Sequence, residues 1–238
     1  MTRLSVNINK VALLRNARGG NLPDLIKFAM DCERFGAQGI TVHPRPDQRH
    51  ITFRDVRDLK SIVKTEFNME GYPSGNFLKL VTEVLPDQVT LVPDAPDQIT
   101  SDHGWDTLTH HGFLKEIIDE LKRNKIRTSL FVDPVNKFVE GAANCGVDRI
   151  ELYTESYARN FSSGRSQAIE PFIHASQTAL ICQLGINAGH DLNLENLRFF
   201  KKNLPDLLEV SIGHALISDA LYLGIENSIQ LYLKELEI

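Results

Sequence analysis

Short apolar runs alternate with longer amphipathic stretches along the whole chain, and this alternation limits the possible folds more than any other feature. The short runs are rich in β-branched and other apolar residues, as expected for parallel strands that are covered on both faces. They predict strands at residues 4–8, 39–43, 67–71, 88–92, 128–133, 149–153, 186–188 and 209–212. The chain therefore reads as a series of strand–helix units, which is typical of an α/β protein.

The stretches between these strands carry apolar residues at the three- and four-residue spacing of one helix face. They predict helices at residues 22–35, 53–64, 76–85, 114–123, 134–145, 166–184, 194–203 and 218–236. Pro23-Asp24 and Asp133-Pro134 are typical of helix starts, and Asp133 is a candidate cap for the helix that follows it. We expect Gly36, Gly146 and Gly185 to end helices in the left-handed conformation that glycine adopts easily.

Eight strand–helix pairs in a chain of 238 residues favour a closed barrel. We predict the α/β class and a single (β/α)₈ TIM barrel with extra short helices in its loops. A doubly wound open sheet is the alternative, but the even repeats favour closure. No linker or low-complexity stretch divides the chain, so we expect one domain over residues 1–238. Residues 93–111 form the longest irregular segment, which is long enough to be a lid or a binding loop.

The bulk composition excludes several classes of function. The net charge of −5 provides no basic field that would attract nucleic acid or a membrane surface. Three cysteines lie far apart without C-x-x-C spacing, so the sequence predicts neither a disulfide framework nor a zinc motif. The first residues lack the apolar core of a signal peptide, and no apolar run approaches the ~20 residues of a membrane span. We therefore expect a cytoplasmic protein without nucleic-acid or membrane partners.

Polar or ionisable residues stand at the end of nearly every predicted strand. Because the loops that follow the strands of a barrel surround one mouth, these residues are expected to converge. They are Asn7, Asn9, His43, Glu70, Thr100, His103, Asp133, Glu151, Asn187, His190 and the pair Gly213-His214. Taken singly, each has a structural alternative, such as an ion pair between Glu151 and Arg149. Such groups are costly to bury without partners, so their convergence indicates a site.

Two glycine-containing segments, residues 187–190 and 211–215, are suited to binding phosphate. Backbone N–H groups approach an anion closely at glycine, and the start of a helix adds a favourable dipole. A second cationic group follows the second strand and consists of Arg45, Arg49 and His50, while Arg18-Gly19-Gly20 can form a flexible arm. Two anion sites indicate two phosphorylated groups; the alternative is that the glycines only turn the chain and the arginines bind surface carboxylates. The histidines lack a metal-binding spacing, so we predict no metal.

Six segments, taken in this order, resemble the pyridoxine 5′-phosphate synthase family of the deoxyxylulose-dependent vitamin B6 route. They are NINKVALLRNARGG, GITVHPRPDQRHIT, FNMEG, LVPD, INAGH and SIGHALI. Each alone is weak, but the set is highly specific and spans essentially the whole chain. The resemblance implies a ring-forming transferase that condenses 3-amino-2-oxopropyl phosphate with 1-deoxy-D-xylulose 5-phosphate. The implied products are pyridoxine 5′-phosphate, phosphate and water, formed by acid/base catalysis without a cofactor.

The resemblance also implies roles for individual residues. His43 and Glu70 would be proton acceptors, His190 a proton donor, and Glu151 would stabilise a transition state. The amino-ketone phosphate would contact Asn7, Arg18, Gly213 and His214. The pentulose phosphate would contact Arg45, His50 and Thr100. The family assembles as a homo-octamer built from dimers, so we expect the same here.

Three further positions are predicted to bind substrate although they depart from the usual family pattern. Asn9 and Lys10 stand where many members carry Asp-His, and Asp191 stands where glycine is common. Lys10 still provides a cation for a phosphate. At Asp191 we expect the backbone contact to change.

The required chemistry consists of imine formation between the two substrates, loss of water and phosphate, and ring closure. Each step moves protons, which placed carboxyl and imidazole groups can do. A Schiff-base aldolase of the same architecture often has a lysine on the sixth strand, where this chain has Glu151. The alternatives are another TIM-barrel phosphosugar isomerase or aldolase, a non-catalytic barrel that binds phosphorylated metabolites, and a metal-dependent hydrolase.

Overall fold

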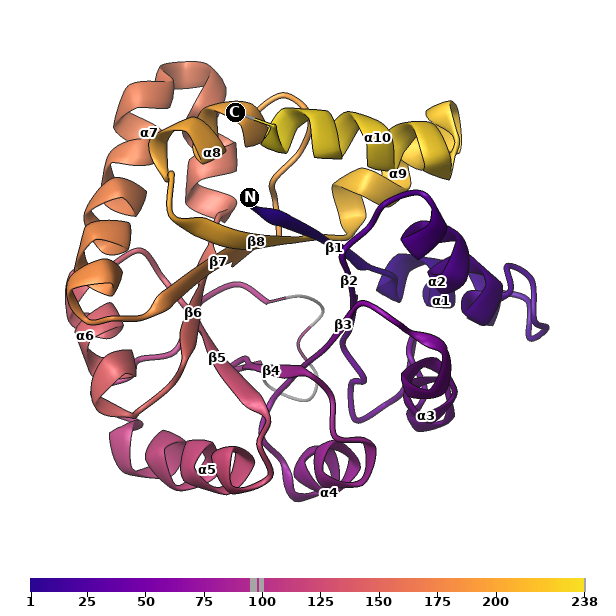
Figure 1. Cartoon of the computed structure of the whole chain (residues 1–238), viewed down its shortest axis with the longest axis horizontal. Helices are drawn as coiled ribbons and strands as arrows, with labels where there is room; N and C mark the ends of the chain where they lie inside the picture. Colours follow the sequence, from indigo (N-terminus) through magenta and orange to yellow (C-terminus); the bar gives the residue numbers. More distant parts are fainter. Residues whose placement is uncertain (95–97, 99–100, 238) are drawn as a thin grey trace.

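The strands form a closed parallel barrel in a computed structural model that describes residues 1–94, 98 and 101–237. The strands follow one another around the barrel in chain order, and β1 closes it by pairing with β8 (Figure 1). Their bounds are β1 Arg3–Asn7, β2 Gly39–Val42, β3 Glu66–Gly71, β4 Gln88–Leu91, β5 Arg127–Val132, β6 Arg149–Tyr153, β7 Gly185–Gly189 and β8 Leu207–Ile212. The predicted TIM barrel is confirmed, and the predicted strands match to within a few residues at each end.

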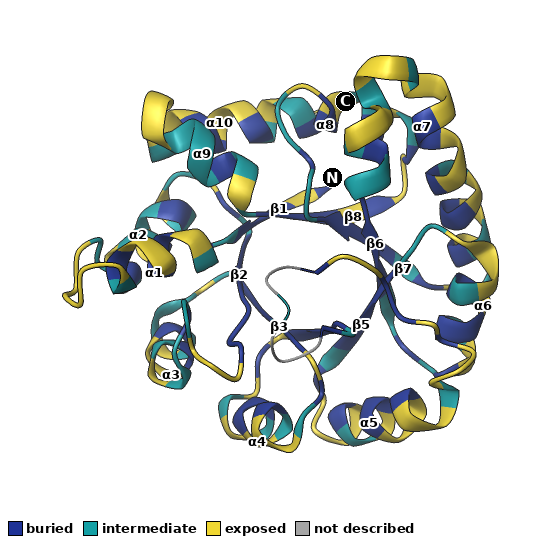
Figure 2. Cartoon of the chain, turned by 180° about the vertical axis from the view of Figure 1, so that it is seen from behind, coloured by how far each residue is buried: buried dark blue, intermediate teal, exposed yellow. Residues whose placement is uncertain are grey.

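The helices lie outside the barrel and cover the outward faces of the strands (Figure 1). Their bounds are α1 Asn9–Asn16, α2 Leu25–Arg34, α3 Phe53–Ile62, α4 Gly75–Val84, α5 His111–Arg123, α6 Asn136–Asn144, α7 Glu155–Ile181, α8 Leu197–Asn203, α9 His214–Leu223 and α10 Ile225–Leu236. Figure 2 shows buried strands and helices that are buried on the inner face and exposed on the outer one. Among the described residues, no helix is both long enough and apolar enough to cross a membrane.

Three helical regions differ from the prediction. Helix α1 begins directly after β1, where we expected only polar residues at a strand end. Helix α7 begins eleven residues before the predicted start at residue 166 and bends at Gly164, whose backbone is not helical. The predicted helix at residues 218–236 is in fact two helices, because Gly224 interrupts it with a φ of 79°. Helices α1 and α9 are extra short helices in the loops, as predicted.

The residues predicted to start and end helices were confirmed only in part. Asp24 caps α2, since its side chain accepts a hydrogen bond from the Lys27 backbone N–H at 3.0 Å. Asp133 does not cap α6, because it accepts from the Gly104 N–H at 3.1 Å and the helix starts beyond it. Gly185 does not end a helix either. It is the first residue of β7, where a Cβ atom would lie 2.8 Å from Arg149, so glycine permits close packing there.

The inside of the barrel is polar, which the strand pattern did not predict. Hydroxyl and amide groups of successive strands bond to one another across the interior. Ser5 and Thr41 share a hydrogen bond of 2.7 Å, and Asn68 donates to Thr41 at 3.3 Å. Thr90 lies within 3.3 Å of both Asn68 and Glu151, so this chain of contacts reaches the sixth strand. Each of these buried side chains therefore has a partner, as its desolvation requires.

Candidate active site

A cavity of about 620 Å³ opens where the strands end at their carboxyl side. It is lined by Asn7, Asn9, Lys10, Leu13, His43, Arg45, Arg49, His50, Glu70, Val92, Ser101, Phe131, Glu151, His190, Asp191, Ser211, Gly213 and His214. The convergence expected from the strand ends is present for most of those residues, although His103, Asp133 and Asn187 do not line the cavity. The residues predicted to act in catalysis or to bind substrate all line it except Arg18 and Thr100.

The two exceptions have different reasons. Arg18 lies in an exposed turn after α1 and does not line the cavity. The sequence predicts a flexible arm that follows the first strand. In the structure, helix α1 lies between β1 and this turn. Thr100 lies outside the residues that the structure describes.

His43 and Glu70 face each other at one side of the mouth. The His43 Nδ1 and Glu70 Oε2 atoms are 3.8 Å apart, and His43 directly follows β2 while Glu70 lies on β3. Asn7 donates to Glu70 Oε2 at 3.3 Å, and Ser211 donates to Oε1 at 3.4 Å. Asn9 accepts a hydrogen bond of 2.9 Å from the His43 backbone N–H. These neighbours fix both groups before any ligand enters.

The surroundings favour the neutral forms of this pair. Burial raises the pKa of Glu70 to about 8, and the charge of Asp94 adds to the increase. Burial also lowers the pKa of His43 well below its usual value, and Arg45 and His50 lower it further. A carboxylic acid and a neutral imidazole therefore lie side by side near neutral pH. Such a pair can exchange protons with a substrate.

Glu151 is a second buried carboxyl group, on β6 across the mouth. It accepts a hydrogen bond of 3.3 Å from Thr90, and it is 3% exposed. Burial raises its pKa to about 8, with the charge of Glu70 as the second cause. Ionisation of either Glu70 or Glu151 makes ionisation of the other less favourable. The alternative pairing with Arg149 is wrong, because that side chain points to the opposite end of the barrel and pairs with Glu209 at 3.6 Å.

His190 follows β7 and stands in the turn that ends this strand. Its Nδ1 atom lies 2.5 Å from Asp191 Oδ2, and its ring meets the ring of Tyr153 edge-on, with the centroids 5.1 Å apart. Its backbone φ is 90°, a value that few residues other than glycine adopt. The charge of His190 also opposes the rise in the pKa of Glu151. The mouth thus has an imidazole on each side.

The predicted phosphate segment at residues 211–215 fits an anion. Gly213 directly precedes α9, and a Cβ atom there would lie 3.0 Å from Asn7, so the chain approaches β1 closely. The first turn of α9 faces the cavity, because both Gly213 and His214 line it. The N–H groups at the start of a helix bind anions without further partners. This end of the cavity is therefore suited to a phosphate.

The segment at residues 187–190 differs from the prediction of a second phosphate loop. Asn187 is 1% exposed inside the barrel and accepts a hydrogen bond from Arg149. A Cβ atom at Gly189 would lie 2.6 Å from Glu151 Oε1, so glycine there makes room for that carboxyl group. The backbone N–H of Asp191 donates to Thr154 at 3.3 Å. This segment delivers His190 and Asp191 to the mouth but does not form a phosphate cradle.

The predicted cationic group of Arg45, Arg49 and His50 lines the cavity, but an ion pair and a lowered pKa reduce its positive charge. Arg45 donates to Asp94 at 2.6 Å, and both side chains are buried. Burial lowers the pKa of His50 to about 4, and the charges of Arg45 and Arg49 contribute. His50 is therefore neutral near pH 7 and can act there only as a hydrogen-bonding group. Lys10, in the first turn of α1, adds an exposed cation to the lining.

Several residues of the site were not predicted. Phe131 faces inward on β5, and strand alternation from its register partner Glu151 would have found it, while Val92 directly follows β4. The sequence has no local signal for the action of Ser211 and Asp94 on Glu70, the first through a hydrogen bond and the second through its charge. Within the described ranges, no group of three or more metal-ligating side chains is arranged to hold a metal ion.

Comparison with known proteins shows similarity over the whole chain. A family model described as "Pyridoxal phosphate biosynthesis protein PdxJ" matches residues 4–237. The chain is 65% identical over 237 residues to the pyridoxine 5′-phosphate synthase of Cytophaga hutchinsonii, with 100% of both chains covered. It is 62% identical over 237 residues to the enzyme of the same name from Flavobacterium johnsoniae, again with 100% of both covered.

Solved structures show similarity at the level of the fold. Phosphoribosyl anthranilate isomerase from Thermotoga maritima has a TM-score of 0.65 at 14% identity, covering 100% of this chain and 99% of its own. Thiamine phosphate pyrophosphorylase from Pyrococcus furiosus has a TM-score of 0.66 at 12% identity, covering 99% and 95%. At these identities the likeness concerns the barrel alone.

Proposed function

Because this chain belongs to the PdxJ family and has the activity of a pyridoxine 5′-phosphate synthase, we propose how its cavity performs that reaction. The cavity condenses 3-amino-2-oxopropyl phosphate with 1-deoxy-D-xylulose 5-phosphate and releases pyridoxine 5′-phosphate, phosphate and water. One observation carries the proposal: two imidazoles and two buried carboxyl groups from four different strands line a single cavity beside a helix start. The barrel formed by residues 1–238 supplies all of these groups.

Glu70 and His43 are the proton acceptors in this proposal. The pKa of Glu70 is about 8 in the empty site, so the group is largely protonated there near neutral pH. An ammonium group beside it favours the ionised form, so binding of the amino ketone prepares Glu70 to take a proton and release the nucleophilic amine. His43 is already neutral because its pKa is lowered, and it can accept a proton from the imine intermediate.

His190 and Glu151 act on the opposite side of the mouth. His190 donates a proton to the oxygen that leaves as water. Glu151, once ionised, stabilises the positive charge that develops on the imine nitrogen. The imine forms between the two substrates.

The phosphate groups are bound at opposite ends of the cavity. The start of α9, with Gly213, His214 and the neighbouring Asn7, binds the phosphate of the amino ketone. The pentulose phosphate is held by the other polar groups of the lining, which are Asn9, Lys10, Arg45 and His50, and Asp191 contributes through its backbone. Arg18 and Thr100 complete the proposed contacts, Arg18 from its turn outside the cavity. Holding both substrates together lowers the entropic part of the barrier.

The test is to incubate the purified protein with both phosphorylated substrates and to follow the absorbance of the pyridine ring. We expect the chromophore with the wild-type protein and its loss in E70Q, which should still bind the substrates. A phosphosugar isomerase or aldolase would convert one substrate alone. Absence of the pyridine product with pure, folded protein would overturn the proposal.

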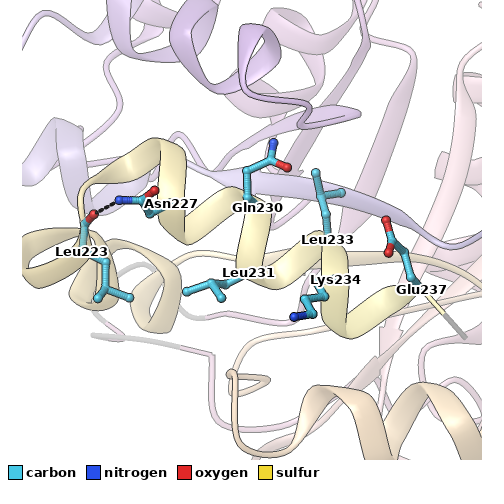
Figure 3. A pocket seen from close by; sticks show the side chains of 7 residues that line it. All are labelled: Leu223, Asn227, Gln230, Leu231, Leu233, Lys234 and Glu237. Atoms are coloured by element: carbon cyan, nitrogen blue, oxygen red, sulfur yellow. Dashed lines mark hydrogen bonds between the residues drawn. The ribbon is translucent and has the colours of Figure 1, made fainter.

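We further propose that the chain assembles as a homo-octamer built from dimers and functions in the cytoplasm. Exposed apolar side chains on α9 support assembly, since Leu221 is 74% exposed and Tyr222 is 91% exposed. A groove of about 660 Å³ runs along α10, with Leu223 and Leu231 on one side of it (Figure 3). Sedimentation equilibrium should give eight times the chain mass of 26.8 kDa, and a monomer would contradict the assembly. Cell fractionation tests the location.

A further inference from the structure

We propose that Asp191 is a positioning residue that orients His190, and that Thr154 fixes the turn on which both residues stand. In this arrangement His190 carries its proton on Nδ1, towards Asp191, and presents Nε2 to the substrates. The inference rests on the proposed function for the role of His190 in proton transfer. It goes beyond that function because it assigns the Asp191 side chain to the imidazole and not to a substrate.

The contact between the two side chains carries the first step. The Nδ1 atom of His190 and the Oδ2 atom of Asp191 are 2.5 Å apart, which is a short hydrogen bond. The side chains are 27% and 37% exposed, and both line the cavity. A carboxylate accepts only, so the neutral imidazole must place its hydrogen on Nδ1. In this tautomer Nε2 is the basic nitrogen of the ring.

The backbone of the turn shows that this geometry is imposed by its surroundings. His190 has a φ of 90°, a strained conformation that residues other than glycine keep only where their surroundings hold it. Thr154 is completely buried and bonds on both sides of His190. Its hydroxyl donates to the Gly189 carbonyl at 2.7 Å and accepts from the Asp191 N–H at 3.3 Å. Asn196 adds a hydrogen bond of 3.3 Å to the Asp191 carbonyl.

An aromatic contact limits rotation of the His190 ring. Tyr153 meets the imidazole at an interplanar angle of 83°, with the centroids 5.1 Å apart. Burial raises the pKa of Tyr153 to about 12, and the charge of Asp191 is the next cause. The phenol therefore stays neutral over the working range of pH, and the ring contact is not changed by its ionisation. The adjacent Tyr153 and Thr154 thus fix the imidazole ring and its backbone together.

The chemical consequence concerns the form in which His190 meets the substrates. The carboxylate of Asp191 fixes the orientation and the tautomer of the imidazole ring, and Glu151 and His43 interact electrostatically with this ring across the cavity. A glycine at position 191 would have no side chain for this purpose.

The decisive measurement is the tautomer of His190 in the substrate-free protein. Long-range proton–nitrogen correlation spectra of isotope-labelled protein identify which ring nitrogen carries the hydrogen, and the H190Q variant assigns the signal among the eight histidines. We expect the Nδ1–H form in the wild type and a shift towards the Nε2–H form in D191N. The Nε2–H form in the wild type, or an unchanged spectrum in D191N, would overturn the inference.

Kinetics supply the second readout. Partners of this kind typically change activity by about 10–100-fold, so we expect D191N to lose that much in kcat while KM changes by less than about threefold. T154V, which keeps the shape but removes the hydroxyl group, should lose about tenfold, and T154S should restore most of it. Equal losses in T154V and T154S, or a full kcat in D191N, would contradict the role. If the wild type forms no pyridine product, the proposed function fails, while the tautomer spectra still decide the geometry.

Discussion

Carboxyl groups are buried at both ends of the barrel, but their ion-pair partners differ between the two ends. At the amino-terminal end of the strands, Glu66 pairs with Arg127 and with Arg3, the latter at 3.1 Å. Glu209 pairs there with Arg149 at 3.6 Å. The arginines help to lower the pKa of Glu66, although burial acts in the opposite direction. Charge at this end is neutralised by cations, as expected for a structural ion-pair network.

The carboxyl-terminal end lacks this compensation among the residues that the structure describes. Glu70 has an ion-pair contact only with His43, whose own pKa is lowered, and Arg45 directs its charge to Asp94. The pKa of Glu70 therefore rises to about 8. Glu209 also has a raised pKa, caused by burial and by its hydrogen bond to Glu66, but its proton is enclosed by ion pairs. Glu70, a proposed catalytic carboxyl, thus differs from Glu66 in lacking an arginine ion-pair partner among the described residues and in lining a cavity.

The largest expected effect is a difference in turnover between substitutions at the two ends of the barrel. We expect E70Q to lower kcat by about 10²–10⁴-fold, because it removes a group that transfers protons. The matched control is E66Q on the same strand, where the turnover of the folded protein should stay within about threefold of the wild type. Equal losses of turnover in both variants would show that the distinction between the ends is wrong.

The second expected effect is a difference in the free energy of unfolding between substitutions at the two ends of the barrel. R127M removes one of the two arginines that form ion pairs with the buried Glu66 among the described residues and leaves the half-exposed Arg3. It should lower the free energy of unfolding by about 2–4 kcal/mol. Glutamine replaces a protonated glutamic acid almost isosterically, so E70Q should change this free energy by less than about 1 kcal/mol near pH 6. Urea denaturation measures both. A larger loss in E70Q than in R127M would reverse the comparison.

The third effect is a pH dependence of stability at the mouth. The pKa of Glu151 is about 8 in the folded protein and 4.5 without the fold, so its proton stabilises the folded state fully below pH 4.5. This contribution is lost as the pH rises through about 8. The E151Q variant has no ionisable group at this position, so this pH dependence is absent from it. Its free energy of unfolding relative to the wild type should therefore increase by about 1–3 kcal/mol between about pH 5.5 and about pH 8.5. A difference that is constant with pH would contradict the raised pKa.

The smallest effect concerns the neighbours of Glu70. Asp94 is the second cause of its raised pKa, and Asp94 also holds Arg45, which lowers that pKa. D94N removes the negative charge and leaves the positive one unpaired, so both changes lower the pKa of Glu70. The limb near pH 8 in the profile of kcat/KM should move down by about half a unit to one unit. An upward shift, or none, would show that Glu70 does not produce this limb.

Most of the site was predictable because its residues stand at the ends of recognisable strands. His43, Glu70, Glu151 and His190 are conspicuous polar residues after or within apolar runs, and the barrel topology brings such positions together. The position of Arg18 outside the cavity was not predictable, because α1 forms after β1 from residues with little apolar periodicity. The segment at residues 187–190 was misread because a glycine that makes room for a neighbouring side chain looks the same in the sequence as one that binds phosphate.

The amino-acid sequence by itself determined the barrel, through the alternation of strands and helices, and it determined which ionisable groups stand at the mouth. It did not determine the protonation of those groups. Glu66 and Glu70 lie on the same strand, yet the pKa of the first is lowered and that of the second is raised. At Glu70 burial and the charge of Asp94 raise the pKa, whereas at Glu66 the hydrogen bond with Glu209 and the charge of Arg127 outweigh burial. Only the tertiary structure brings these partners near, because burial and charge act over a few ångströms of space and not along the chain.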